Sequence, residues 1–121
     1  MQIKTIFKIQ SIIFLINGLG QLFYTDKFFE MANMEITSSL VTLGQFLGAS
    51  FIFLSILTWK TSNLTGEALK EFGNAWALGC LMWTAIIGYH VAIGAAGGTT
   101  VIVNMGMFAV FGVLYFISSK K

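Results

Sequence analysis

The sequence of 121 residues contains no proline, one cysteine and few charged residues. Charged side chains make up 10% of it, whereas a soluble domain has roughly 25%. All seven basic residues are lysines, so no guanidinium is present to hold a phosphate or carboxylate by paired hydrogen bonds. The net charge of +2 comes from scattered lysines, which gives no indication of a nucleic-acid-binding surface. Cys80, the single cysteine, excludes an intrachain disulfide.

Apolar residues fill most of the sequence in four long runs, at about 5–24, 38–59, 72–96 and 100–117. Each run is close to the ~20 residues that an α-helix needs to cross the hydrocarbon core of a bilayer. The hydrophobic fraction of 56% and the mean hydropathy of +0.81 agree with such spans. We therefore predict an all-α fold, an integral-membrane four-helix transmembrane bundle that forms a single domain over residues 1–121.

The lysines predict how this bundle is oriented. Four spans place both termini and the loop between the second and third spans on one side, and the first loop on the other. Lys27 is the lysine of the first loop, whereas six lysines lie on the side of the termini: Lys4, Lys8, Lys60, Lys70, Lys120 and Lys121. Because lysine-rich short loops stay in the cytoplasm, we expect cytoplasmic termini and a multi-pass protein of the cell inner (plasma) membrane. No small-residue cleavage site follows the first run, which predicts an uncleaved span.

Local patterns predict three finer features. Tyr115 is expected near the cytoplasmic interface, where amphipathic rings gather. Thr25 or Asp26 is expected to cap a short helix in the first outer loop. Thr65 and Gly66 are expected to begin the third long helix, with acid in its first turn.

Small residues recur on one face of the second span, where Gly44, Gly48 and Ser55 predict close helix packing. Packing inside the bundle is the simpler interpretation, because every compact bundle needs such faces. A homodimer seam is the alternative.

Polar side chains inside the spans are the candidate ligand-binding residues. At a rise of 1.5 Å per residue, each side-chain amide or imidazole of the four spans except that of Gln21 lies about 6–11 Å below the outer end of its helix. Because a polar group facing lipid is costly, we expect them to converge on an outward-facing pocket with aromatic walls. The candidates are the polar residues Asn17, Gln21, Gln45, His90 and Asn104, with Trp83 in the aromatic wall. The alternative is that they form ordinary interhelical hydrogen bonds, worth about 0.6–2 kcal/mol each.

Several chemistries lack the residues they need. One histidine and one mid-span cysteine cannot supply the three or four ligands of a metal site. No Asp, Glu or Arg lies within the four runs, which disfavours the proton-coupled antiport of small four-helix multidrug exporters. No nucleophile–base pair or carboxylate pair is present, so no catalytic residues are predicted and an enzymatic role is disfavoured. The residues demand no cofactor; a quinone, a lipid or a pigment ligated by His90 are the candidates for the pocket.

The first predicted helix ends in Gly18-Leu19-Gly20-Gln21-Leu22-Phe23-Tyr24. The second contains Leu43-Gly44-Gln45-Phe46-Leu47-Gly48-Ala49 and closes with Leu57-Thr58-Trp59-Lys60. With these segments the sequence resembles the DoxX-like group of small four-helix bacterial membrane proteins. Gln45 stands where such sequences often carry a basic residue. The resemblance implies a membrane subunit, associated in some members with quinone-linked or thiol-linked redox partners.

Three functions follow as hypotheses. The first is a non-catalytic protein that works by association in the lipid bilayer, as an accessory subunit beside other membrane subunits or as a homo-oligomer. The second is a binding or permeation unit for a neutral lipid, quinone or amphiphile. The third, from the resemblance alone, is a membrane subunit of a redox system.

Overall fold

Helices account for nearly all of the residues that the computed structural model describes, 2–120. Four of them are long and one is short: α1 Ile3–Phe23, α2 Thr25–Glu30, α3 Ser38–Thr61, α4 Gly66–Ala92 and α5 Gly98–Ser119. Each of the four long helices is long and apolar enough to cross a membrane. The predicted all-α architecture with four apolar helices is therefore confirmed.

The bounds of α4 differ most from the apolar run at 72–96. The helix begins at Gly66 after an extended Thr65, as the local pattern predicts. It ends at Ala92 because Gly94 adopts a left-handed conformation with φ +76°. The Ala95 N–H then donates to the His90 carbonyl and the Gly94 N–H to that of Val91, which is a Schellman C-cap. The other three long helices lie within two residues of their predicted bounds.

The short helix predicted in the first outer loop is α2, but its predicted cap is wrong. Tyr24 is the N-cap residue, and no side chain caps the helix. The Thr25 hydroxyl instead donates to the Gln21 carbonyl oxygen at 2.5 Å, so it satisfies an acceptor in the last turn of α1.

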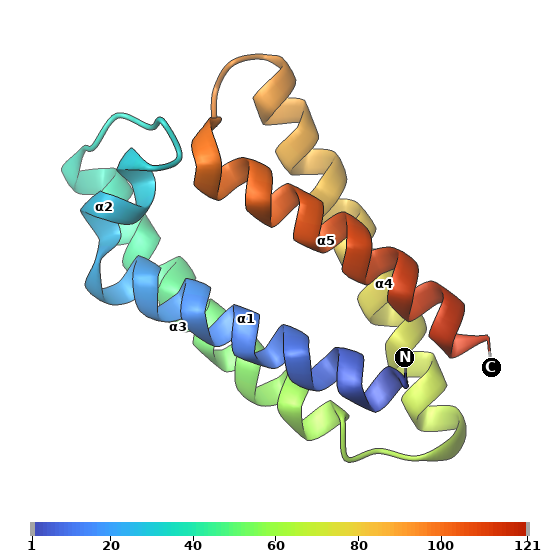
Figure 1. Cartoon of the computed structure of the whole chain (residues 1–121). Helices are drawn as coiled ribbons and strands as arrows, with labels where there is room; N and C mark the ends of the chain where they lie inside the picture. The colour runs from blue at the N-terminus through green and yellow to red at the C-terminus, as the bar shows by residue number, and fades with distance from the viewer. Residues whose placement is uncertain (1, 121) are drawn as a thin grey trace.

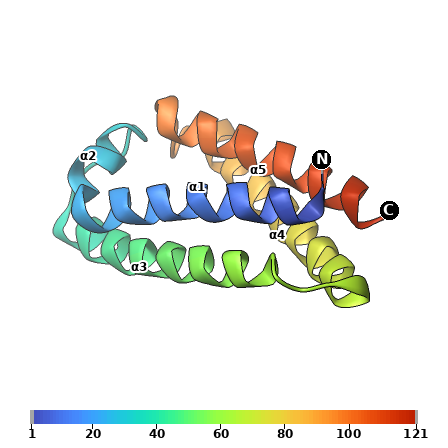
Figure 2. The ribbon, with the colours of Figure 1, turned by 60° about the horizontal axis from the view of Figure 1, so that its bottom comes forward.

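The long helices form two antiparallel pairs, α1 with α3 and α4 with α5, and the pairs meet chiefly along α1 and α5 (Figures 1 and 2). At one end, the loop after α2 links the pairs, since the Gly97 N–H donates to the Ala32 carbonyl at 3.1 Å. At the other end lie both ends of the described chain and the loop from α3 to α4 (Figure 1).

Small residues allow α1 and α3 to approach closely. A Cβ added to Gly48 would lie 2.8 Å from the Gly18 carbonyl oxygen and 2.7 Å from the Leu22 nitrogen. About two helix turns away, the hydroxyl of Ser11 donates to the Ser55 carbonyl and that of Ser55 to the Ser11 carbonyl, both at 2.7 Å.

Gly44 faces α2, where an added Cβ would meet the Phe29 ring and the Thr25 methyl group. Gly44, Gly48 and Ser55 thus all take part in contacts within the chain.

Candidate functional site: the α1–α5 seam and the α4–α5 groove

Two facing stripes of polar and aromatic side chains form the contact between the helix pairs, here called the α1–α5 seam. The residues of each stripe are three or four apart, so they share one helix face. The α1 stripe is Phe7, Gln10, Phe14 and Asn17, and the α5 stripe is Asn104, Phe108, Phe111 and Tyr115. Since the helices are antiparallel, Phe7 meets Tyr115, with ring centroids 4.8 Å apart, and Phe14 meets Phe108 at 6.2 Å.

A buried hydrogen-bonded group lies at the end of the seam nearest the termini. Tyr115 donates to Gln10 Oε1 at 2.5 Å, and Gln10 Nε2 donates to Cys80 Sγ at 3.5 Å. Tyr115 is fully buried, and Gln10 and Cys80 are 2% and 3% exposed. The group therefore joins α1, α4 and α5 in the interior. Tyr115 lies four residues before the end of α5, so its depth near the membrane interface stays a prediction, and its hydroxyl is bonded inside the bundle.

Sequence reasoning missed Gln10 as a site residue. A pattern could have found it, because Gln10 precedes Asn17 by seven residues on the same α1 face. The partners of Gln10 cannot be found this way, since Cys80 and Tyr115 are 70 and 105 residues away in sequence.

Asn17 and Asn104, two of the predicted residues, come together further along the seam. Each donates its side-chain amide to its own helix, Asn17 to the Ile13 carbonyl at 3.2 Å and Asn104 to the Thr100 carbonyl at 2.9 Å. Both line a cavity of about 10 Å³ that Gln10 and Phe14 also border. This volume is about that of one water molecule, so a quinone ring or a lipid does not fit there.

The other predicted residues lie elsewhere. Gln45 is exposed on α3 and lines a separate surface pocket beside the start of α2. His90 is exposed near the end of α4, with its ring 5.2 Å from that of Tyr89. Gln21 is buried on α1, and Trp83 stacks on Phe108 at 5.4 Å between centroids.

A pigment or metal on His90 would therefore sit outside the bundle. Within residues 2–120, no three His, Cys, Asp or Glu side chains gather as metal ligands.

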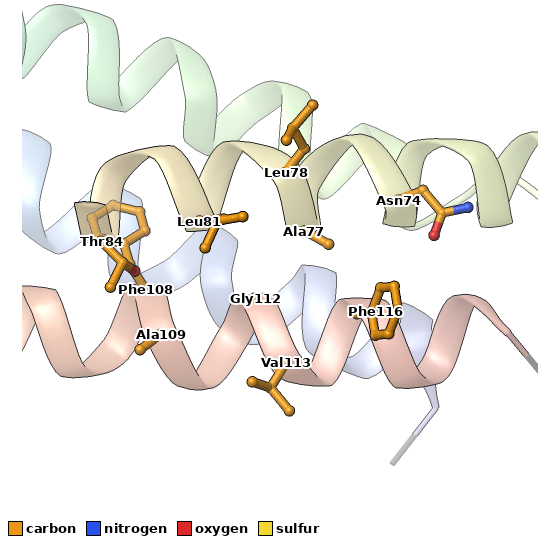
Figure 3. A pocket seen from close by; sticks show the side chains of 10 residues that line it. All are labelled: Asn74, Ala77, Leu78, Leu81, Thr84, Phe108, Ala109, Gly112, Val113 and Phe116. Atoms are coloured by element: carbon orange, nitrogen blue, oxygen red, sulfur yellow. The ribbon is translucent and has the colours of Figure 1, made fainter. Parts of the chain in front are cut away.

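A larger cavity of about 570 Å³, here called the α4–α5 groove, lies on the outer side of α4 and α5 (Figure 3). Its floor is where the two helices approach, since a Cβ added to Gly112 would lie 3.2 Å from the Cys80 Cβ. Its lining is almost entirely apolar: Asn74, Ala77, Leu78, Leu81, Thr84, Phe108, Ala109, Gly112, Val113 and Phe116. Asn74 and Phe116 stand at one end, Thr84 and Phe108 at the other (Figure 3).

One polar side chain of the groove is free to bind. The Thr84 hydroxyl donates to the Cys80 carbonyl at 2.8 Å and is thus engaged. Asn74 is exposed, and its amide takes part in no hydrogen bond among residues 2–120.

The α4 helix is also the least buried of the four long helices. Only 6% of its most apolar stretch of 18 residues is buried, against 39% in α1.

No protein-family model, curated protein or solved structure matches the chain. The resemblance to the DoxX-like group therefore stays a prediction.

Proposed function

We propose that this protein is a non-catalytic membrane protein that works by association, with its α4–α5 groove receiving a transmembrane helix of another subunit or of a second copy. The observation that carries the proposal is this apolar groove, where the small side chains of Ala77 and Ala109 leave room for a helix backbone to come close. In lipid, close packing of small residues replaces the hydrophobic drive that associates helices in water. The Asn74 amide, which has no hydrogen-bond partner among residues 2–120, adds a polar group at one end of the groove.

The proposal includes cytoplasmic termini in the plasma membrane. Support comes from the lysines of the described residues at the end of the bundle that holds the start of α1, the end of α5 and the α3–α4 loop: Lys4, Lys8, Lys60, Lys70 and Lys120.

Ala109 offers a direct test, because it is exposed in the groove and a larger side chain there obstructs only an incoming partner. We expect Ala109→Phe to weaken association by roughly 10–100-fold, the cost of an overpacked contact. Val110→Phe is the matched control, since Val110 is 58% exposed and does not line the groove.

The measurement has two arms. Single-molecule photobleaching in liposomes counts the copies of the labelled protein, and gentle-detergent purification from native membranes identifies any subunit that co-purifies in fixed stoichiometry. Self-association in liposomes assigns the groove to a second copy, and a co-purifying subunit that is lost in Ala109→Phe but kept in Val110→Phe assigns it to another subunit. Monomers in liposomes together with no such subunit contradict the proposal.

Binding of a neutral amphiphile is the second candidate, and the same groove supports it. A volume of about 570 Å³ is within the range of small-molecule sites, about 300–1,000 Å³, and Asn74 supplies one polar contact at the end of an apolar channel. The candidate predicts one enriched lipid or quinone in mass spectra of the purified protein, lost in Asn74→Leu and kept in Val110→Phe. Equal lipid content in all three proteins contradicts it.

The redox role implied by the resemblance has less support. Cys80 is 3% exposed and bonded to Gln10, so no thiol faces a partner there. A visible absorption spectrum of the purified protein tests for a bound pigment or flavin.

A further inference from the structure

A second large cavity is lined by residues from the start of α1, the start of α4 and the last turn of α5. These three helix ends lie at the same end of the bundle (Figure 1). Its volume is about 570 Å³, and it is separate from the α4–α5 groove. Apolar and basic side chains line it together: Gln2, Ile3, Lys4, Gly66, Leu69, Lys70 and Ser118.

The charge in this cavity is positive. Lys4 forms no ion pair among residues 2–120. Lys70 approaches Glu67 at 3.9 Å, with side chains 40% and 85% exposed. Exposed ion pairs of this kind contribute little free energy, so the Lys70 ammonium is available to bind another anion. No acidic residue lines the cavity.

The beginning of α4 adds to this potential. Gly66, its first residue, lines the cavity, and the Thr65 side chain does not cap the helix. The first N–H groups of α4 are therefore left without a side-chain acceptor, at the positive end of the helix dipole. Glu67 lies in the same turn but outside the lining.

We propose that this cavity binds the phosphate of an anionic phospholipid headgroup, with Lys4 and Lys70 as its two cationic contacts. The apolar wall favours a lipid over a soluble anion, because Ile3 and Leu69 offer a surface along which an acyl chain continues from the headgroup. The cavity also lies at the ends of membrane-length helices, where the lipid headgroups are expected. The inference rests on the proposed membrane insertion and not on association through the groove.

The experiment uses the full chain in nanodiscs of phosphatidylcholine with a minor fraction of phosphatidylglycerol. Native mass spectrometry counts the phosphatidylglycerol molecules that stay bound, in the unchanged protein and in Lys4→Gln, Lys70→Gln and the double variant. At about 1 kcal/mol per lysine near a charged surface, each single substitution should weaken retention about fivefold.

Lys60→Gln is the matched control, since Lys60 is at the same end of the bundle but does not line the cavity. We expect it to leave retention unchanged, and we expect Lys4→Arg with Lys70→Arg to keep it. Circular dichroism in pure phosphatidylcholine establishes that each variant is folded.

Three results overturn the proposal. One is equal retention of phosphatidylglycerol and phosphatidylcholine by the unchanged protein. Another is a loss in Lys60→Gln as large as in the double variant, which indicates diffuse surface attraction. The last is displacement of the lipid by inorganic phosphate, which assigns the cavity to a soluble anion. Failure of the groove substitutions to alter association leaves all three readouts unaffected.

Discussion

At the scale of single residues, the decisive contact is the one between Tyr115 and Gln10. Both side chains are buried, and the hydrogen bond at 2.5 Å satisfies polar groups that would otherwise face apolar surroundings. An unsatisfied buried acceptor costs more than an average hydrogen bond contributes. The seam therefore depends on this pair more than on the asparagines, which also bond to their own helices.

Tyr115→Phe tests this dependence. The substitution leaves Gln10 Oε1 without its donor, and we expect a loss of about 1–3 kcal/mol in the free energy of unfolding. Reversible unfolding in mixed micelles measures the change. Tyr24→Phe is the control, because Tyr24 is 71% exposed and takes part in none of the side-chain hydrogen bonds of residues 2–120. Equal stability of the two variants would show that the bond contributes little.

At the scale of the helices, apolar run length predicts the elements well and their ends less well. The run at 72–96 continues through Ile93–Ala96, whereas α4 stops earlier because Gly94 turns left-handed. Hydropathy carries no information on that local dihedral angle, but a glycine just beyond a helix is a known stop pattern.

The candidate site was less predictable than the helices. Residue spacing gives the depth of a side chain and its direction relative to neighbours on the same helix. It does not give the rotation of that helix in the bundle. Asn17 and Asn104 meet because α1 and α5 pack on each other, whereas α3 and α4 turn Gln45 and His90 to exposed surfaces.

Gly48→Ala tests the packing of α1 on α3. The new Cβ would lie within 2.8 Å of backbone atoms of Gly18 and Leu22, so the helices must move apart. We expect a loss of about 1–3 kcal/mol in the free energy of unfolding. Gly79→Ala in α4 is the matched control, since nothing lies within 4 Å of its added Cβ. Alanine there should stabilise the helix by up to about 1 kcal/mol. Equal effects at the two positions would contradict the close approach.

At the scale of the whole molecule, the two helix pairs and their one-sided lysines predict the threading through the bilayer. Cysteine introduced in place of Lys60 or Asp26, in a Cys80→Ala background, should react with an impermeant maleimide from opposite faces of sealed vesicles. We expect the position of Lys60 to be labelled from the cytoplasmic face and that of Asp26 from the other. Labelling of both positions from the same face would contradict the predicted threading, in which the two loops lie on opposite sides of the membrane.

The bond between Gln10 and Tyr115 also has a consequence for biogenesis. During synthesis α1 enters the bilayer first, and the tyrosine that accommodates its glutamine is made 105 residues later. Until α5 is made, Gln10 Oε1 lacks its donor. We therefore expect a chain truncated before α5 to be less stable than the full chain.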